Sequence, residues 1–143
     1  MIKRVLTTVV AATFLAALPN LHSAEKGKAQ VDPSKLPPAS DKKGVTFAAD
    51  IQPVFEKSCV KCHGAEKPKA KLRLDSLPGT MKGSEDGPVV KPGDSASSVL
   101  VHNIAHVGDP DMYMPPPKNK ANIGPLTKEQ IGLIRAWIDQ GAK

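Results

Sequence analysis

The residues best suited to chemistry stand together in one pentapeptide, CVKCH at residues 59–63. Cys59 and Cys62 are the two cysteines of the chain, and His63 follows the second directly. A Cys-x-x-Cys-His sequence is the attachment motif of haem c. Two thiols on roughly one helical turn reach the two vinyl groups of one porphyrin, and the adjacent histidine becomes the proximal iron ligand. The motif therefore predicts one covalently attached haem c.

Three other uses of a Cys-x-x-Cys pair compete with haem attachment. A structural disulfide is possible outside the cytoplasm. A thioredoxin-like redox pair needs a surrounding alternation of strands and helices, which this sequence lacks. A zinc site usually needs two more sulfur or imidazole ligands at suitable spacing. The trailing histidine and an export signal at the N-terminus together favour haem over all three.

The second axial position of the iron needs a ligand from elsewhere in the chain. A neutral thioether suits an electron carrier because it raises the potential of the iron. Met114 is our first choice, because three prolines follow it, hold the backbone extended and limit its motion. Met112 is the second choice, and Met81 lies in a Gly-rich stretch with nothing to fix it. His102, His106 or an open site remain as alternatives, and both methionines near the prolines could simply pack as apolar side chains.

His102 and His106 are four residues apart on a predicted helix, so we expect them on one face. Such a pair could bind copper or zinc, or reach a haem propionate. A pair of ordinary surface histidines is the commoner arrangement, so the pair carries no prediction of a metal site.

Five lysines flank the haem motif: Lys57, Lys61, Lys67, Lys69 and Lys71. Such charges could steer an acidic redox partner towards the haem edge. Ordinary solvated lysines are an equally good interpretation.

A helix over residues 46–59 must lead into the motif, because apolar residues recur there at helical spacing. Those residues are Phe47, Ile51, Val54 and Phe55. If Asp50 is the N-cap, Pro53 falls in the first turn, where its missing N–H costs nothing. If Thr46 is the N-cap, Pro53 kinks the helix.

The last helix has the clearest boundaries. Thr127 and Gln130 have the spacing of a capping box, and Leu126 and Ile131 that of a hydrophobic staple. Gly141 ends the helix. The other expected segments are a loop at 67–71, an extended stretch at 72–74, turns and loop at 78–93, a helix capped by Asp94 or Ser95 that ends before Gly108, and extended chain at 112–117. The pattern predicts a small, mainly α domain with long irregular connections.

Residues 1–24 have the three parts of a signal peptide in order: a basic start, an apolar run and small residues at 23–24. We expect cleavage after Ala24, with Ser23 as the alternative, and an uncleaved anchor as the competing interpretation. No membrane span would remain after cleavage. Residues 25–45 are rich in Lys, Pro, Ala and Ser and predict a disordered leader or tether. The folded domain is expected at residues 46–143.

Composition narrows the classes of partner. The formal net charge is +6, but the lysines are interspersed with acids, and only 3% of residues are aromatic. A nucleic-acid interface would need a clustered basic face with interleaved aromatics, so we expect no nucleic-acid partner. So few large side chains give a limited core, to which a buried porphyrin would add apolar volume.

Several segments, in this order, resemble the planctomycete-type cytochrome c domains over about residues 46–143. They are Phe47, DIQP at 50–53, CVKCHG at 59–64, LRLDS at 72–76, KPGD at 91–94, SSVL at 97–100, MPP at 114–116 and a C-terminal segment at 126–142 that ends AWIDQGA. The resemblance implies a class I cytochrome c-like helical fold and Met114 as the distal ligand. This chain departs from the family in Tyr113, where a basic residue commonly precedes that methionine, and in its third proline.

The motif and the resemblance together predict an exported, periplasmic electron carrier rather than an enzyme, with His63 and Met114 as axial ligands. Its partners would be other redox proteins, met transiently at the haem edge. One alternative is a haem-based sensor or small peroxidase with an open or labile distal site, although no acid or base set accompanies Met114. Another is a haem accessory subunit of a larger periplasmic enzyme, tethered by residues 25–44.

Overall fold

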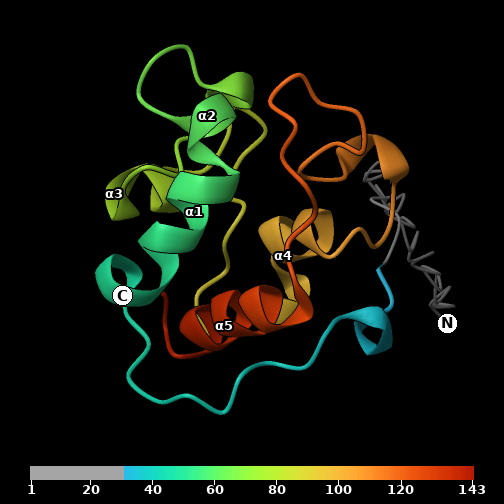
Figure 1. Cartoon of the computed structure of the whole chain (residues 1–143). Helices are drawn as coiled ribbons and strands as arrows, with labels where there is room; N and C mark the ends of the chain where they lie inside the picture. The colour runs from blue at the N-terminus through green and yellow to red at the C-terminus, as the bar shows by residue number, and fades with distance from the viewer. Residues whose placement is uncertain (1–30) are drawn as a thin grey trace, which may run out of the picture.

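The computed structural model describes residues 31–143 (Figure 1). Its α-helices are α1 (Gln52–Ser58), α2 (Val60–His63), α3 (Leu77–Lys82), α4 (Val99–Ile104) and α5 (Lys128–Asp139). The other helical elements are the 3-10 helices η1 (Pro33–Lys35), η3 (Lys69–Lys71), η4 (Ser95–Ser97) and η5 (Pro110–Met112) and the π-helix η2 (Phe47–Ile51). No strand occurs within this range, which confirms the mainly α fold. The predicted signal peptide at residues 1–24 lies outside the described residues.

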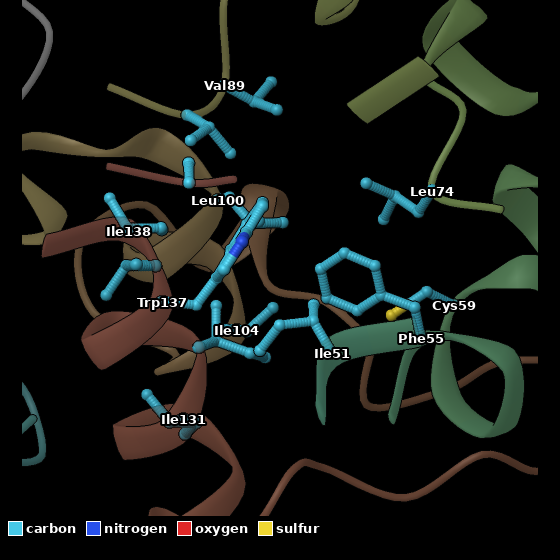
Figure 2. Close-up of a cluster of buried hydrophobic side chains, with 14 of the residues drawn as sticks. Ile51, Phe55, Cys59, Leu74, Val89, Leu100, Ile104, Ile131, Trp137 and Ile138 are labelled. Atoms are coloured by element: carbon cyan, nitrogen blue, oxygen red, sulfur yellow. The ribbon is translucent and has the colours of Figure 1, made fainter. Parts of the chain in front are cut away.

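Trp137 of α5 stands at the centre of the core and is fully buried (Figure 2). The Phe47 ring lies 5.7 Å from the Trp137 ring and 6.0 Å from the Phe55 ring, centroid to centroid. These tilted and edge-on arrangements are favoured for aromatic pairs. Phe55 and Ile51 are also fully buried, and the same cluster reaches Cys59. Packing on α5 therefore fixes where the haem motif begins.

The helix predicted over 46–59 is two elements. Thr46 caps η2, and its hydroxyl accepts a hydrogen bond from the Ala49 N–H at 3.4 Å. Pro53 falls in the first turn of α1, where its missing N–H is harmless. Each of the two expected capping schemes is thus partly right: Thr46 is a cap, and Pro53 lies in the first turn of a new helix, although Ile51 rather than Asp50 is the N-cap of that helix.

The capping box of α5 is present as predicted. The Thr127 hydroxyl accepts from the Gln130 N–H at 3.2 Å, and the Gln130 side chain accepts from the Thr127 N–H at 2.9 Å. Leu126 and Ile131 are both buried, as a hydrophobic staple requires.

Residues 77–82 form α3, where the sequence predicted only turns and loop. The Ser76 hydroxyl caps this helix by accepting from the Gly79 N–H at 3.2 Å, and Pro78 occupies the first turn. The cap and the proline at the start together outweigh the low helix propensity of the glycine. The extended chain expected at 112–117 also begins one residue later, since Met112 closes η5.

Residues 31–45 run along α5 and are not a disordered leader. Leu36 and Val45 are buried, and the Ser40 N–H donates to the Gly132 carbonyl at 2.9 Å. The prediction of disorder for 25–45 is therefore wrong for residues 31–45, while residues 25–30 lie outside the described range.

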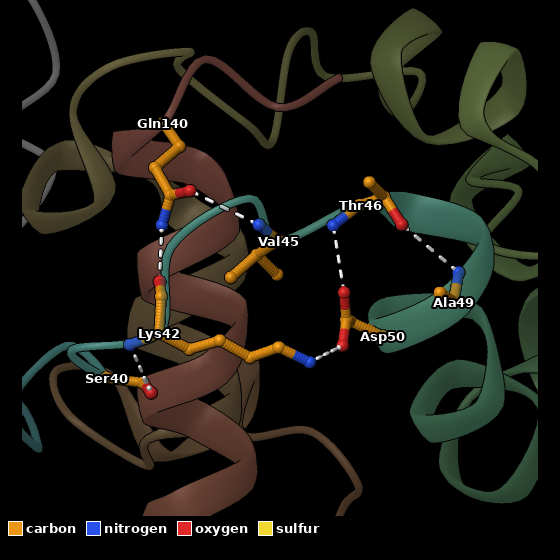
Figure 3. Close-up of polar contacts among 7 residues, drawn as sticks. All are labelled: Ser40, Lys42, Val45, Thr46, Ala49, Asp50 and Gln140. Carbon is orange, nitrogen blue, oxygen red and sulfur yellow. Dashed lines mark hydrogen bonds and ion pairs between the residues drawn. The ribbon is translucent and has the colours of Figure 1, made fainter.

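Polar groups of α5 and of its C-cap residue, Gln140, hold this segment in place. The Gln140 side chain donates to the Lys42 carbonyl at 2.8 Å and accepts from the Val45 N–H at 3.2 Å (Figure 3). The Arg135 guanidinium donates to the Pro37 carbonyl, and Lys42 pairs with Asp50. The amino-acid composition of residues 31–45 gave no indication of this packing. The contacts are made largely to backbone groups of the segment, which composition does not reveal.

Gly132→Ala should loosen this segment. A Cβ at residue 132 would lie 2.7 Å from the Pro38 carbonyl oxygen, and overpacking of this kind costs about 1–3 kcal/mol. We expect faster tryptic cleavage after Lys35 and Lys43 in the folded variant, measured by mass spectrometry. Gly124→Ala is the matched control, because its Cβ would meet nothing within 4 Å. Equal cleavage rates in the two variants would contradict the packing described.

Candidate functional site

One cavity of about 390 Å³ lies against the haem motif. Its chemically distinctive wall residues are Cys59, Cys62, His63, Met112 and Met114. The volume is within the range of roughly 300–1,000 Å³ that is usual for small-molecule and cofactor pockets. The cavity therefore gathers the predicted attachment residues and both preferred methionines around one space.

The backbone of α2 holds the motif in a single helical turn. The N–H groups of Cys62 and His63 both donate to the Cys59 carbonyl, at 3.0 and 2.9 Å. Gly64 follows directly, where a Cβ would lie 2.7 Å from the Val60 carbonyl oxygen, so the tight turn after the motif needs glycine.

Both cysteines are free thiols, and Cys59 is 8% exposed. Burial, followed by the nearby Cys62, raises the pKa of the Cys59 thiol to about 12. The thiol is therefore neutral at physiological pH, which is the state compatible with an apolar wall. A disulfide, one of the alternatives for this pair, is not formed.

His63 is buried, and its Nδ1 has no hydrogen-bond partner within residues 31–143. Burial lowers the pKa of the imidazole, and the charge of Lys69 acts in the same direction, while the backbone groups of Leu72 and Lys69 oppose it. A neutral imidazole keeps a lone pair for a metal ion. An unpartnered polar atom in a buried ring requires an explanation, and a site built for a further group supplies one.

Met114 lines the cavity from the segment that follows α4. Its N–H donates to the Asn103 carbonyl at 2.9 Å, which ties it to α4, and the following Pro115 is buried. Met112 lines the same cavity but is 45% exposed. Met81 lies in α3 and lines a different groove. Of the two methionines that line the cavity beside the haem motif, Met114 is the less exposed.

The expectation that His102 and His106 share one helical face is wrong. The helix α4 ends at Ile104, and His106 has a left-handed backbone with φ of 54°. The His102 Nε2 lies 2.6 Å from the Ala96 carbonyl oxygen, whereas the His106 ring stacks on Tyr113. No group of three or more His, Cys, Asp or Glu side chains suited to a metal occurs within residues 31–143.

The lysines that flank the motif are all exposed. Lys71 forms an ion pair with Glu85 at 3.3 Å, and its side chain remains 79% exposed. Surface ion pairs of this kind contribute little to stability.

Several wall residues were not singled out from the sequence. Leu72 and Leu74 cover one side of the cavity, and the Leu74 N–H donates to the His63 carbonyl at 2.8 Å. The alternating Leu-Arg-Leu pattern could have indicated their inward orientation. Leu100 and Asn103 reach the cavity from α4. The Leu100 position followed from helical periodicity, but nothing in the sequence marked Asn103.

The wall composition fits a haem. Two thiols and a neutral imidazole come from one segment, a thioether comes from another, and the wall between them is largely apolar. A porphyrin needs such apolar contacts, and Met and His are recognised axial ligands of its iron.

No helix among residues 31–143 is both long and apolar enough to cross a membrane.

Comparison with known proteins identifies the same segment. A family model described as Planctomycete cytochrome C matches residues 59–118, a range that includes the attachment motif and Met114. No curated protein and no solved structure matches the chain. Residues 59–118 thus match the model of the planctomycete cytochrome c family, which confirms the resemblance found in the sequence.

Proposed function

We propose that this chain is an exported electron carrier that holds one haem c and passes single electrons between redox partners. The observation that carries the proposal is the convergence of Cys59, Cys62, His63 and Met114 on one cavity with largely apolar walls. When bound, haem supplies reversible one-electron chemistry at iron. The match of residues 59–118 to a cytochrome c family supports a haem-binding electron carrier in general, without naming a partner or the iron ligands.

The residues of the chain have distinct tasks in this proposal. Cys59 and Cys62 hold the porphyrin through thioethers, so a small domain keeps its cofactor without enclosing it fully. His63 and Met114 would supply the imidazole and thioether ligands of the iron. The hydrogen bond from the Met114 N–H to the Asn103 carbonyl limits movement of the ligand when the charge of the iron changes. Apolar walls and a thioether ligand both favour the reduced iron.

The proposal also covers where the protein acts and what it meets there. Covalent haem attachment through this motif is typical of exported proteins, and the residues at 1–24 have the order of a signal peptide. We propose that redox proteins dock transiently at the rim of the cavity, where Lys61, Lys67 and Lys69 are exposed nearby in the chain. The packing of residues 31–45 on α5 leaves them unavailable as a long tether to an enzyme.

Met114→Ala should keep the covalent haem but lose the low-spin, six-coordinate spectrum and the weak sulfur-to-iron band. The potential should fall, because the thioether that favours ferrous iron is gone. Optical spectra and a redox titration measure both effects. Met112→Ala is the matched control and should keep the wild-type spectrum, since the Met112 side chain is exposed at the rim. A wild-type spectrum in Met114→Ala would remove Met114 from the iron.

Cys59→Ala and Cys62→Ala should each leave a single thioether, and the double variant should lose covalent haem altogether. Denaturing gel electrophoresis followed by a haem stain checks retention, because only covalently held haem survives denaturation. Full retention in the double variant would show that haem is not attached at this motif.

The reduced protein should resist carbon monoxide. A thioether held in place by its own backbone competes with an added ligand, whereas a sensor or peroxidase needs an open or easily vacated position. Titration of the ferrous protein with carbon monoxide, followed optically, measures this directly. Saturation at low concentration would support the sensor or peroxidase alternative instead.

A further inference from the structure

The end of α4 contains a residue that is unusual for its position. The Val107 N–H donates to the His102 carbonyl at 3.0 Å, and the His106 N–H donates to the Asn103 carbonyl at 3.3 Å. This is the Schellman pattern, and it places His106 at the left-handed position that glycine normally occupies. With φ of 54°, His106 adopts a conformation that is unfavourable for a residue with a Cβ. Five other described residues with a Cβ also have positive φ, so a role for the His106 side chain has to follow from its contacts.

The His106 side chain stacks on a residue from the other end of the same loop. The His106 and Tyr113 rings are parallel within 3°, with centroids 4.7 Å apart. The Tyr113 hydroxyl donates a long hydrogen bond, 3.4 Å, to the Gly108 carbonyl. Glycine at residue 106 would satisfy the backbone better but would provide no ring. The stack therefore closes the loop between residues 106 and 113.

Met114 follows Tyr113 directly, and its N–H donates to the Asn103 carbonyl at 2.9 Å. The same carbonyl accepts the His106 N–H, so one oxygen atom joins the helix end to the methionine backbone. The ring stack and this shared carbonyl fix the backbone immediately before Met114 at two points. With the backbone held at these two points, the freedom that Met114 keeps is that of its side chain, which lines the cavity.

We infer that the stacked pair of His106 and Tyr113, the aromatic clasp, positions Met114 as the axial ligand. The inference rests on the proposed haem ligation. His106 and Tyr113 are positioning residues, because neither lines the haem cavity. Holding the loop in its ligating conformation lowers the entropy that Met114 loses when it binds iron, and so raises its advantage over a competing ligand.

The test uses the exported holoprotein and added imidazole, which competes with Met114 for ferric iron. His106→Gly removes the ring while supplying the residue that the helix end prefers, so the fold is kept. Tyr113→Leu removes the other ring, and Tyr113→Phe is the matched control that keeps the stack without the hydroxyl. Loss of the sulfur-to-iron band, followed during an imidazole titration, gives the affinity.

We expect His106→Gly and Tyr113→Leu to bind imidazole roughly three- to tenfold more tightly than wild type, the range that a stacked aromatic pair is worth. Tyr113→Phe should stay within about twofold of wild type. If the wild-type band is present and His106→Gly and Tyr113→Leu bind imidazole like wild type, the clasp is wrong while the ligation stands. If the wild-type protein lacks the band, the proposed ligation fails and the clasp fails with it.

Discussion

The packing of Phe47 between Trp137 and Phe55 determines where the haem attachment motif lies. Trp137 and Phe55 are fully buried, and the three rings join the C-terminal helix α5 to η2 and α1. Because α1 ends at Ser58, the position of Cys59 follows from this contact. A domain with few large side chains thus has most of its aromatic residues at the junction that orients the haem motif.

The opposite wall of the cavity is built by a different kind of contact. Backbone hydrogen bonds and one ring stack, besides some apolar packing, hold the chain between α4 and Met114. The two sides therefore differ in what holds them: core packing fixes the attachment side, and polar contacts at the end of α4 add to the packing on the side that carries Met114. A carrier needs both properties, because covalent attachment must be permanent, whereas the axial thioether only has to remain in place while iron changes charge.

The sequence was most informative where a local pattern has a local cause. The capping box of Thr127 and Gln130 and the helical spacing before Cys59 correspond to elements that the structure contains. The haem motif and Met114 also lie at one cavity, although they are about fifty residues apart in the chain. Those predictions depended on spacing, capping chemistry and a specific pentapeptide, all of which can be read without knowing the fold.

The predictions failed where a contact joins distant segments through backbone groups. Contacts with Arg135 of α5 and with its C-cap residue Gln140 order residues 31–45, whereas composition alone made that stretch resemble a leader. The separation of His102 from His106 arises because α4 stops at Ile104, a boundary that periodicity does not give. The sequence did not indicate a role for Asn103 either, because that role depends on where the fold places its backbone carbonyl.

The most direct test of the account is the optical spectrum of the exported, matured wild-type protein, first oxidised and then reduced. The account predicts a low-spin c-type spectrum with a sulfur-to-iron band in the oxidised form, because a histidine and a methionine ligate one covalently bound haem. A high-spin c-type spectrum would contradict the carrier function and favour ligand binding. Absence of haem would contradict the central claim itself.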